Sequence, residues 1–146
     1  MTLDATYNPG NIFAKIISGD IPCARVYEDE RILSFMDAFP QSKGHTLVIP
    51  KVAACNLFDI GDDDLQNLIV HTRRIARAVR DALAPDGLRI IQFNGEAAGQ
   101  TVFHLHFHIL PIWEGQTPAR HGESGMADIE VLKATAARIA EKLARS

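Results

Sequence analysis

The spacing of hydrophobic and polar residues along this chain of 146 residues predicts three helices. From Asp62 to about Leu83 apolar residues recur at three- and four-residue steps, which is typical of a long amphipathic helix. The same spacing over residues 128–144 predicts a terminal helix. Asn11 can cap a short helix that runs through Ile17.

Short apolar or alternating runs predict strands at residues 25–28, 32–36, 45–51, 88–93 and 104–110. Short connections between strands favour antiparallel pairing. We therefore expect an α+β fold, in which helices cover one face of a five-stranded antiparallel meander sheet. The stretch from residue 113 to residue 125 is polar and irregular, and His121 within it is predicted to be an exposed loop residue.

The last predicted strand places three of the six histidines on every second residue, in the order His104-Leu105-His106-Phe107-His108-Ile109-Leu110. Successive side chains of a strand point to opposite faces. One face of this strand is therefore expected to carry imidazole rings and the other to be apolar.

Such a row of imidazoles has three interpretations. It can be a solvated polar face, or it can bind a metal ion. On a regular strand the first and third rings start about 13 Å apart, so only two of them could join one zinc ion, with another ligand from elsewhere. The third interpretation is catalysis, because a neutral imidazole is a nucleophile and a proton carrier near neutral pH. The clustering favours catalysis.

The bend before this strand offers hydrogen-bond donors. Gly99 lets the backbone approach a ligand closely, and Gln100 and Thr101 supply an amide and a hydroxyl group. Donors beside imidazoles suit a phosphate group. Glycine in a bend can also serve the turn alone, so this segment by itself is a weak signal.

The composition excludes several classes of protein. A net charge of −3 is not that of a general nucleic-acid binder. No apolar run is long enough to span a bilayer and no signal peptide opens the chain, so we expect a cytoplasmic protein. Cys23 and Cys55 are too isolated to indicate a disulfide or a metal knuckle. We expect one domain over residues 1–146, with a loose N-terminal arm at 1–10 and a tail and helix at 112–146.

The triad segment matches the histidine triad (HIT) pattern, in which three histidines alternate with apolar residues, and the preceding Gly99-Gln100 also fits. Over about residues 11–111 the chain resembles HIT superfamily proteins of the Hint and Fhit type, and especially the small bacterial HIT hydrolases. The resemblance implies a five-stranded antiparallel sheet with the long helix packed across it. It also implies a homodimer formed around that helix and the adjoining strand.

The resemblance further implies catalysis at the α-phosphate of a purine nucleotide conjugate. His106 would be the nucleophile and would form a nucleotidyl-histidine intermediate, from which water releases a nucleoside monophosphate. His104 and His45 would orient this ring, and His108 would donate to a phosphate oxygen or assist the leaving group. No cofactor and no metal would be needed.

The residues expected to bind substrate also follow from the resemblance. Phosphate oxygens, ribose hydroxyls and the base would be held by Asp37, Asn94, Gly99, Gln100, Thr101, Ile12, Phe13, Ile21, Phe35 and Leu47. Asp37 would accept hydrogen bonds from the ribose. The alternative for Asp37 is turn capping, and the apolar members can equally be plain core residues.

The chain departs from its relatives in ways that affect substrate choice. Thr101 stands where Hint-like proteins commonly have serine, and Ile112 stands where Fhit-like proteins have arginine. The Trp-Pro-Pro-Gly tail of Hint proteins is replaced by a predicted helix. A nucleoside phosphoramidate, a dinucleoside polyphosphate and an adenylylated small molecule therefore all remain candidates. Two other classes also stay open, namely a metal-binding histidine site and a nucleotide-binding regulatory module with incidental hydrolysis.

Overall fold

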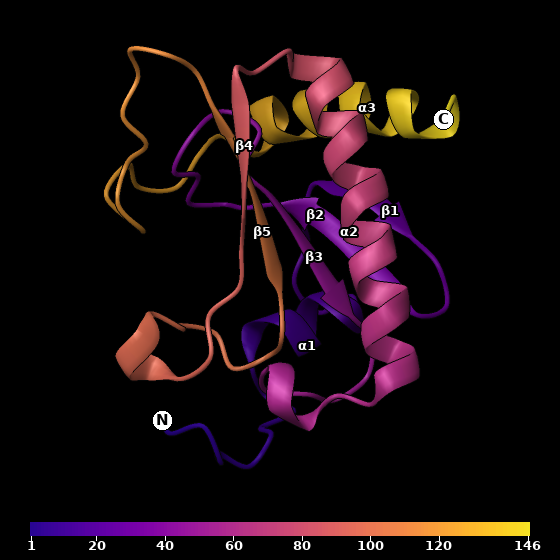
Figure 1. Ribbon diagram of the computed structural model, residues 1–146, viewed down its shortest axis with the longest axis vertical. Helices are drawn as coiled ribbons and strands as arrows, with labels where there is room; N and C mark the ends of the chain where they lie inside the picture. The colour runs from indigo at the N-terminus through magenta and orange to yellow at the C-terminus, as the bar shows by residue number, and fades with distance from the viewer.

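In the computed structural model, which describes residues 1–146, a central antiparallel sheet separates two groups of helices (Figure 1). Its strands are β1 (Arg25–Glu28), β2 (Ile32–Met36), β3 (Thr46–Pro50), β4 (Gly87–Ile91) and β5 (Phe107–Ile112). The helices are α1 (Ile12–Ile17), α2 (Asp62–Leu83) and α3 (Ile129–Ala144), with single 3-10 turns η1 (Leu57–Asp59) and η2 (Glu96–Ala98). None of the helices has the length and apolar character needed to cross a membrane.

The strand order is β1-β2-β3-β5-β4, and every neighbouring pair is antiparallel. The predicted α+β class, the antiparallel sheet and the long helix are confirmed, but the meander holds only for β1 to β3. Helix α2 carries the chain back along the sheet, so that β4 runs in the same direction as β3. Two such strands cannot pair antiparallel, and β5, which runs the other way, lies between them.

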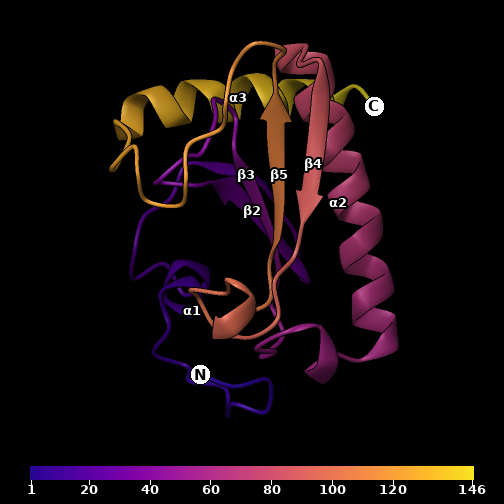
Figure 2. The same ribbon diagram turned by 60° about the vertical axis from the view of Figure 1, so that its left-hand side comes forward.

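The predicted helices are confirmed, and so is the predicted cap at Asn11. The Asn11 side chain accepts a hydrogen bond from the backbone N–H of Ala14, and the Asp128 side chain accepts one from that of Glu130. Three aspartates occupy the first turn of α2, where negative charge is favourable. In Figure 2, α2 stands on one side of β4 and β5, while α1 lies toward the other side.

Alternation along the strands divides the interior into two apolar clusters. The larger cluster, between the sheet and helices α2 and α3, includes Leu105 and Ile109. The smaller cluster, on the opposite face beside α1, consists of Phe13, Leu33, Phe35, Leu47 and Ile49. The apolar residues of the triad segment thus enter the main core, and the alternation directs its histidines to the other face, as predicted.

Strand β5 begins later than the sequence predicts. Only His108 of the triad lies within it, paired with Leu47 of β3, whereas His104 and His106 precede its first residue, Phe107. The backbone there pairs outside the sheet, since Leu105 donates to the carbonyl oxygen of Ala54. The hydrophobic alternation continues across this boundary, which is why the pattern alone could not locate it.

Candidate active site

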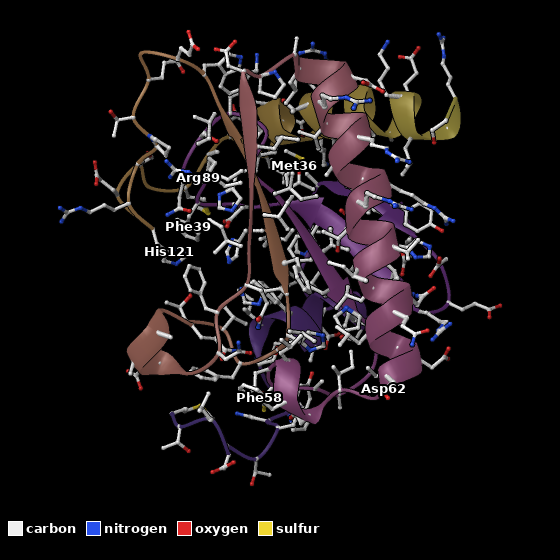
Figure 3. The ribbon with its side chains drawn as sticks, in the orientation of Figure 1. Met36, Phe39, Phe58, Asp62, Arg89 and His121 are labelled. Carbon is white, nitrogen blue, oxygen red and sulfur yellow. The ribbon has the colours of Figure 1, made fainter.

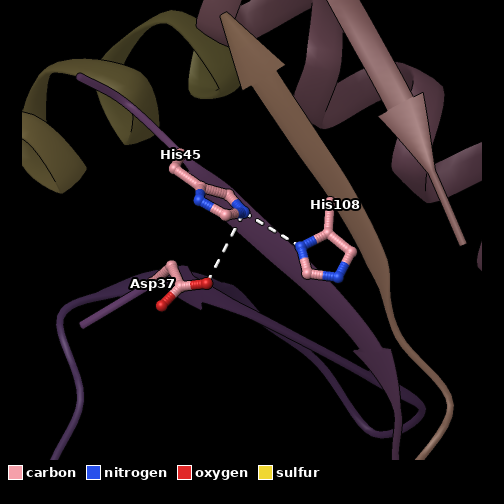
Figure 4. A group of neighbouring side chains, drawn as sticks. All are labelled: Asp37, His45 and His108. Atoms are coloured by element: carbon pink, nitrogen blue, oxygen red, sulfur yellow. Dashed lines mark hydrogen bonds and ion pairs between the residues drawn. The ribbon is translucent and has the colours of Figure 1, made fainter. Parts of the chain in front are cut away.

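Four histidines and one aspartate converge on the face of the sheet opposite α2. His45 and His104 are fully buried, and His106, His108 and Asp37 are each only 7% exposed. Asp37 follows β2 and His45 precedes β3, so the β2–β3 connection presents both side chains toward β5. The nearest ligand atoms of Asp37, His45 and His108 all lie within 4.8 Å of one another (Figure 4).

The hydrogen bonds of His45 and His108 define their tautomers. The backbone N–H of Gln41 donates to His45 Nδ1 at 3.1 Å, so the proton of the neutral ring is on Nε2. His45 Nε2 lies 2.9 Å from His108 Nδ1 and 3.5 Å from Asp37 Oδ2. His108 Nδ1 therefore accepts, and its own proton is on Nε2. The pair presents an N–H donor at His108 Nε2.

The other two rings, His104 and His106, carry their protons on different nitrogens. His106 Nδ1 lies 2.7 Å from the carbonyl oxygen of His104, and a carbonyl can only accept, so His106 carries its proton on Nδ1. His106 Nε2 then has a free lone pair. His104 Nε2 donates to the carbonyl oxygen of Pro50 at 2.7 Å, which leaves His104 Nδ1 as an acceptor.

Burial keeps these imidazoles neutral. It lowers the pKa of His106 to about 3, with a further contribution from the neighbouring His108. Burial also lowers the pKa values of His45 and His108 to about 4. The pKa of His104 is lowered by burial, although its hydrogen bond to Pro50 acts the other way. At neutral pH the site therefore contains uncharged rings, including one with an available nucleophilic nitrogen.

An apolar wall stands beside His106. The Phe13 ring meets the His106 ring edge-on, with centroids 4.9 Å apart, and also packs against Phe35 at 5.4 Å. Phe35 and Leu47 are buried in the same cluster. Of the other apolar residues predicted to line the site, Ile21 is half-buried on the segment after α1, and Ile12 is exposed at the start of that helix.

The loop before the triad is braced from within. Gln100 is buried, and its amide donates to the carbonyl oxygens of Cys55 and Val102, at 2.6 and 3.0 Å, while its side-chain oxygen accepts from Gly95 N–H. Both amide hydrogens of Gln100 are thus committed to the protein. In this arrangement Gln100 has no free amide hydrogen for the donation to a phosphate group that was expected of it. Its side chain instead stabilises the conformation of the loop.

The remaining predicted residues of this loop differ in exposure. Asn94 exchanges amide hydrogen bonds with Gln92 and accepts from the N–H of Leu57, so it too ties segments together. Gly99 adopts φ +110°, and a side chain there would meet the ring of Phe93. Thr101 is exposed. The structure therefore brings the four histidines, Asp37 and the apolar wall together, and no contact joins Thr101 to them.

Two residues near the site were not predicted to belong to it. Tyr7 contacts His104, and nothing in its isolated position within the first ten residues indicates this. His121 is exposed, as predicted, but its loop docks against the segment after Asp37, because Ala119 N–H donates to Gln41 and Ala127 N–H donates to Ala38. Figure 3 places His121 and Phe39 on the side of the sheet away from Asp62. A positive charge on His121 lowers the pKa values of four groups in the site, namely Asp37, His45, His106 and His108.

Comparisons with known proteins find similar sequences and structures. Residues 18–114 match the family model described as HIT domain. Protein hit of Bacillus subtilis is 51% identical over 100 residues, which are 68% of this chain and 69% of that protein. Adenosine 5'-monophosphoramidase hnt1 of Schizosaccharomyces pombe is 39% identical over 100 residues, 68% of this chain and 72% of that protein.

A solved structure is similar over almost the whole chain. A Hit-like protein from Bartonella henselae, described as involved in cell-cycle regulation and solved with an unknown ligand, superposes with a TM-score of 0.87 at 43% identity. The match covers 94% of this chain and 99% of that one. The similarity therefore extends beyond residues 18–114, which the family model matches.

Proposed function

This chain belongs to the HIT family, and from that premise we propose that it hydrolyses nucleotide conjugates at the α-phosphate through a nucleotidyl-histidine intermediate. HIT proteins bind nucleotides, and the Schizosaccharomyces pombe relative is named as an adenosine 5'-monophosphoramidase. The products would be a nucleoside monophosphate and the released leaving group. A nucleoside phosphoramidate and a dinucleoside polyphosphate are the two substrate classes that we propose to test.

The observation that carries this proposal is the tautomer of His106. Its Nδ1–H is held by the carbonyl oxygen of His104, so Nε2 keeps a lone pair in a neutral ring. In the first step, Nε2 attacks the α-phosphorus in line with the leaving group. The new N–P bond forms while the bond from phosphorus to the leaving group breaks, which divides one difficult displacement into two easier ones.

The second step regenerates the enzyme. A water oxygen attacks the same phosphorus and loses a proton to solvent, which balances the proton that the leaving group took up in the first step, and the electron pair of the N–P bond returns to His106 Nε2. His108 Nε2–H can donate to a phosphate oxygen in both steps, since the chain of hydrogen bonds from Gln41 through His45 keeps its proton on that nitrogen. One hydrogen-bond donor to an oxygen that gains charge in the transition state typically accelerates a reaction by about 10²–10³-fold. Neither step calls for a cofactor.

Binding of the nucleoside part is assigned to the apolar wall and to Asp37. A purine ring packed on Phe13, Phe35 and Leu47 would lie next to His106, in line with the contacts of that cluster. Asp37 Oδ1 already accepts from the N–H of Phe39, which leaves Oδ2 to accept from ribose hydroxyls beside His45. The exposed Thr101 is proposed to donate its hydroxyl group to a phosphate oxygen.

A metal ion held by Asp37, His45 and His108 is the competing use of the same atoms. Zinc would take the lone pair of His45 Nε2, and the ring proton would then have to move to Nδ1. There it would face the N–H of Gln41 at 3.1 Å, so two donors would meet. The hydrogen bonds therefore favour the metal-free reaction.

We also propose that the protein forms a homodimer through α2 and the free edge of β4. A groove of about 270 Å³ between these elements is lined by Ile69, Val70, Thr72, Arg73, Ala76 and Ile90. Ile69 and Ile90 are 43% and 44% exposed, which is unusual for large apolar side chains beside an unpaired strand edge. A second copy would cover both residues.

The test is turnover of adenosine phosphoramidate and of diadenosine polyphosphates, with and without a chelator, by the natural protein and by His106→Ala. We expect chelator-resistant release of AMP, and a loss of at least about 10³-fold in the variant because its nucleophile is gone. AMP binding by calorimetry, measured in both proteins, controls for folding of the site.

The other outcomes select the alternatives. Full turnover by His106→Ala would overturn the nucleophile assignment. Activity that the chelator abolishes would favour the metal site. AMP binding without turnover of any of these substrates would favour a nucleotide-binding regulatory module. The faster of the two substrate classes would identify the leaving group that the site accepts.

A further inference from the structure

The N-terminal residues contact two segments near the triad, one at Cys55 and Asn56 and the other at Glu96. The backbone carbonyl of Leu3 accepts from the Asn56 side chain at 2.9 Å, and that of Ala5 faces the Cys55 thiol at 3.4 Å. The amino terminus of Met1 pairs with Glu96. These contacts hold the arm at the end of the sheet where η1, η2 and α1 meet, as Figure 1 shows.

Tyr7 ends this arm with a contact to the triad itself. Its hydroxyl lies 2.6 Å from His104 Nδ1, and the two rings meet at an angle of 66° with centroids 5.6 Å apart. Because His104 Nε2–H is committed to Pro50, Nδ1 can only accept, so the Tyr7 hydroxyl is the donor. His104 is fully buried, and without Tyr7 this nitrogen would be a buried acceptor with no partner.

His104 is in turn the residue that sets the reactive nitrogen of His106. Its ring is held at both nitrogens, by Tyr7 and by Pro50, and its carbonyl oxygen accepts the Nδ1–H of His106. A shift of the His104 residue, backbone included, would move its carbonyl oxygen. The hydrogen bond from His106 Nδ1–H, which keeps the lone pair on Nε2, would then weaken. Tyr7 on the N-terminal arm is thus linked to the nucleophile His106 through a single residue, His104.

We infer that Tyr7 is a positioning residue for the catalytic histidine, acting through His104 and contributed by the N-terminal arm. This rests on the proposed function for its kinetic consequence, although the orientation of the rings can be measured without it. Tyr7 contacts His104 and does not touch the reacting atoms. Its hydroxyl should therefore affect the rate of the chemical step and leave nucleotide affinity unchanged.

The test replaces the hydroxyl and keeps the ring, in Tyr7→Phe. The matched control is Tyr27→Phe. The Tyr27 hydroxyl also donates a hydrogen bond at 2.6 Å, to Asp29, and the Tyr27 ring packs against the larger apolar cluster on the other face of the sheet. We expect kcat to fall about tenfold in Tyr7→Phe, as for the loss of one hydrogen bond, with KM and AMP affinity within about twofold. Tyr27→Phe should keep the natural kcat.

The second readout is the ¹⁵N spectrum of the histidine rings. In Tyr7→Phe the His104 Nδ1 resonance should move toward the value of an unpartnered lone pair, and the hydrogen-bonded Nδ1–H signal of His106 should weaken. Unchanged kcat together with unchanged ring signals would overturn the inference. A tenfold loss that comes with lower AMP affinity and a lower melting temperature would also overturn it, since Tyr7 would then be a packing residue.

The two proposals can fail separately. If the natural protein turns over none of the substrates, the proposed function fails, while the ring signals still decide whether Tyr7 holds His104 and His106. If the natural protein is active but Tyr7→Phe matches it in kcat and in both ring signals, only the role of Tyr7 fails.

Discussion

The histidines of the site owe their chemistry to their protein partners more than to their positions in the sequence. His106 and His108 lie two residues apart, yet one offers a lone pair at Nε2 and the other an N–H at the same atom. The difference arises because a carbonyl oxygen faces Nδ1 of His106, whereas another imidazole faces Nδ1 of His108. Burial then lowers the pKa values of both rings, so that these tautomers persist at neutral pH.

The lowered pKa values predict how stability depends on pH. The unfolded chain titrates its imidazoles near pH 6.5, whereas His106, His45 and His108 in the folded chain do so at about 3 to 4. Between these values the unfolded state binds more protons, so the free energy of unfolding is highest above about pH 6.5 and falls toward pH 4. Each such proton contributes about 1.4 kcal/mol per pH unit. Asp37, whose pKa is raised by burial, acts in the opposite direction.

Urea denaturation at about pH 7 and about pH 5 measures this effect. The midpoint should be lower at the acidic pH, and His106→Asn should reduce the difference, since the variant lacks one of the rings whose pKa is lowered in the folded protein. A midpoint that does not change over this interval would mean that the three rings are protonated in the folded protein.

At the scale of elements, the turn before β3 positions His45 through the conformation of a glycine. Gly44 has φ +85°, and a Cβ atom there would lie 2.2 Å from Leu83 at the end of α2 and 3.3 Å from Pro111. The turn is thus packed tightly between a helix and a strand. Gly19 has a similar φ of +87°, but nothing lies within 4 Å of the position its Cβ would take.

Gly44→Ala and Gly19→Ala separate backbone strain from steric contact. Both should lower the free energy of unfolding, by about 1–2 kcal/mol for the strain of the left-handed conformation. Gly44→Ala should cost about 1–3 kcal/mol more, because Leu83 has to move. Chemical denaturation of the two variants checks this difference, and equal losses would show that Leu83 adapts freely.

The elements differ in how far the sequence could predict them. The Asn11 cap is a local signal, and the long helix repeats its apolar spacing over six turns, so both were predicted correctly. The position of β5 between β3 and β4 depends on contacts between distant segments, which no local pattern records. The same holds for the site. The triad spacing identifies the histidines, but the commitment of Gln100 to Cys55 and the contact of Tyr7 follow only from the folded chain.

At the scale of the whole molecule, the free edge of β4 predicts the effect of a charged substitution on assembly. In the proposed homodimer Ile90 of one copy would face the equivalent region of the other, because symmetric interfaces use the same surface twice. Ile90→Glu should therefore convert the dimer into a monomer, which light scattering coupled to size-exclusion chromatography measures. Val131→Glu is the control, since Val131 is 60% exposed on α3 and outside the groove. A natural protein that is already monomeric, or a dimer that survives Ile90→Glu, would contradict this interface.

The central position of β5 has a consequence for how the candidate site forms during folding. His45 and His108 are 63 residues apart in the chain, and they meet only once β5 has entered between β3 and β4. Joining such distant segments is slow, because the entropy of closing a long loop is lost before the contacts form. The chain can build its first three strands and its long helix without possessing a site at all. We therefore expect the site to form late in folding, and a nucleotide that binds the finished site should slow the separation of β5 from its neighbours and so stabilise the whole sheet.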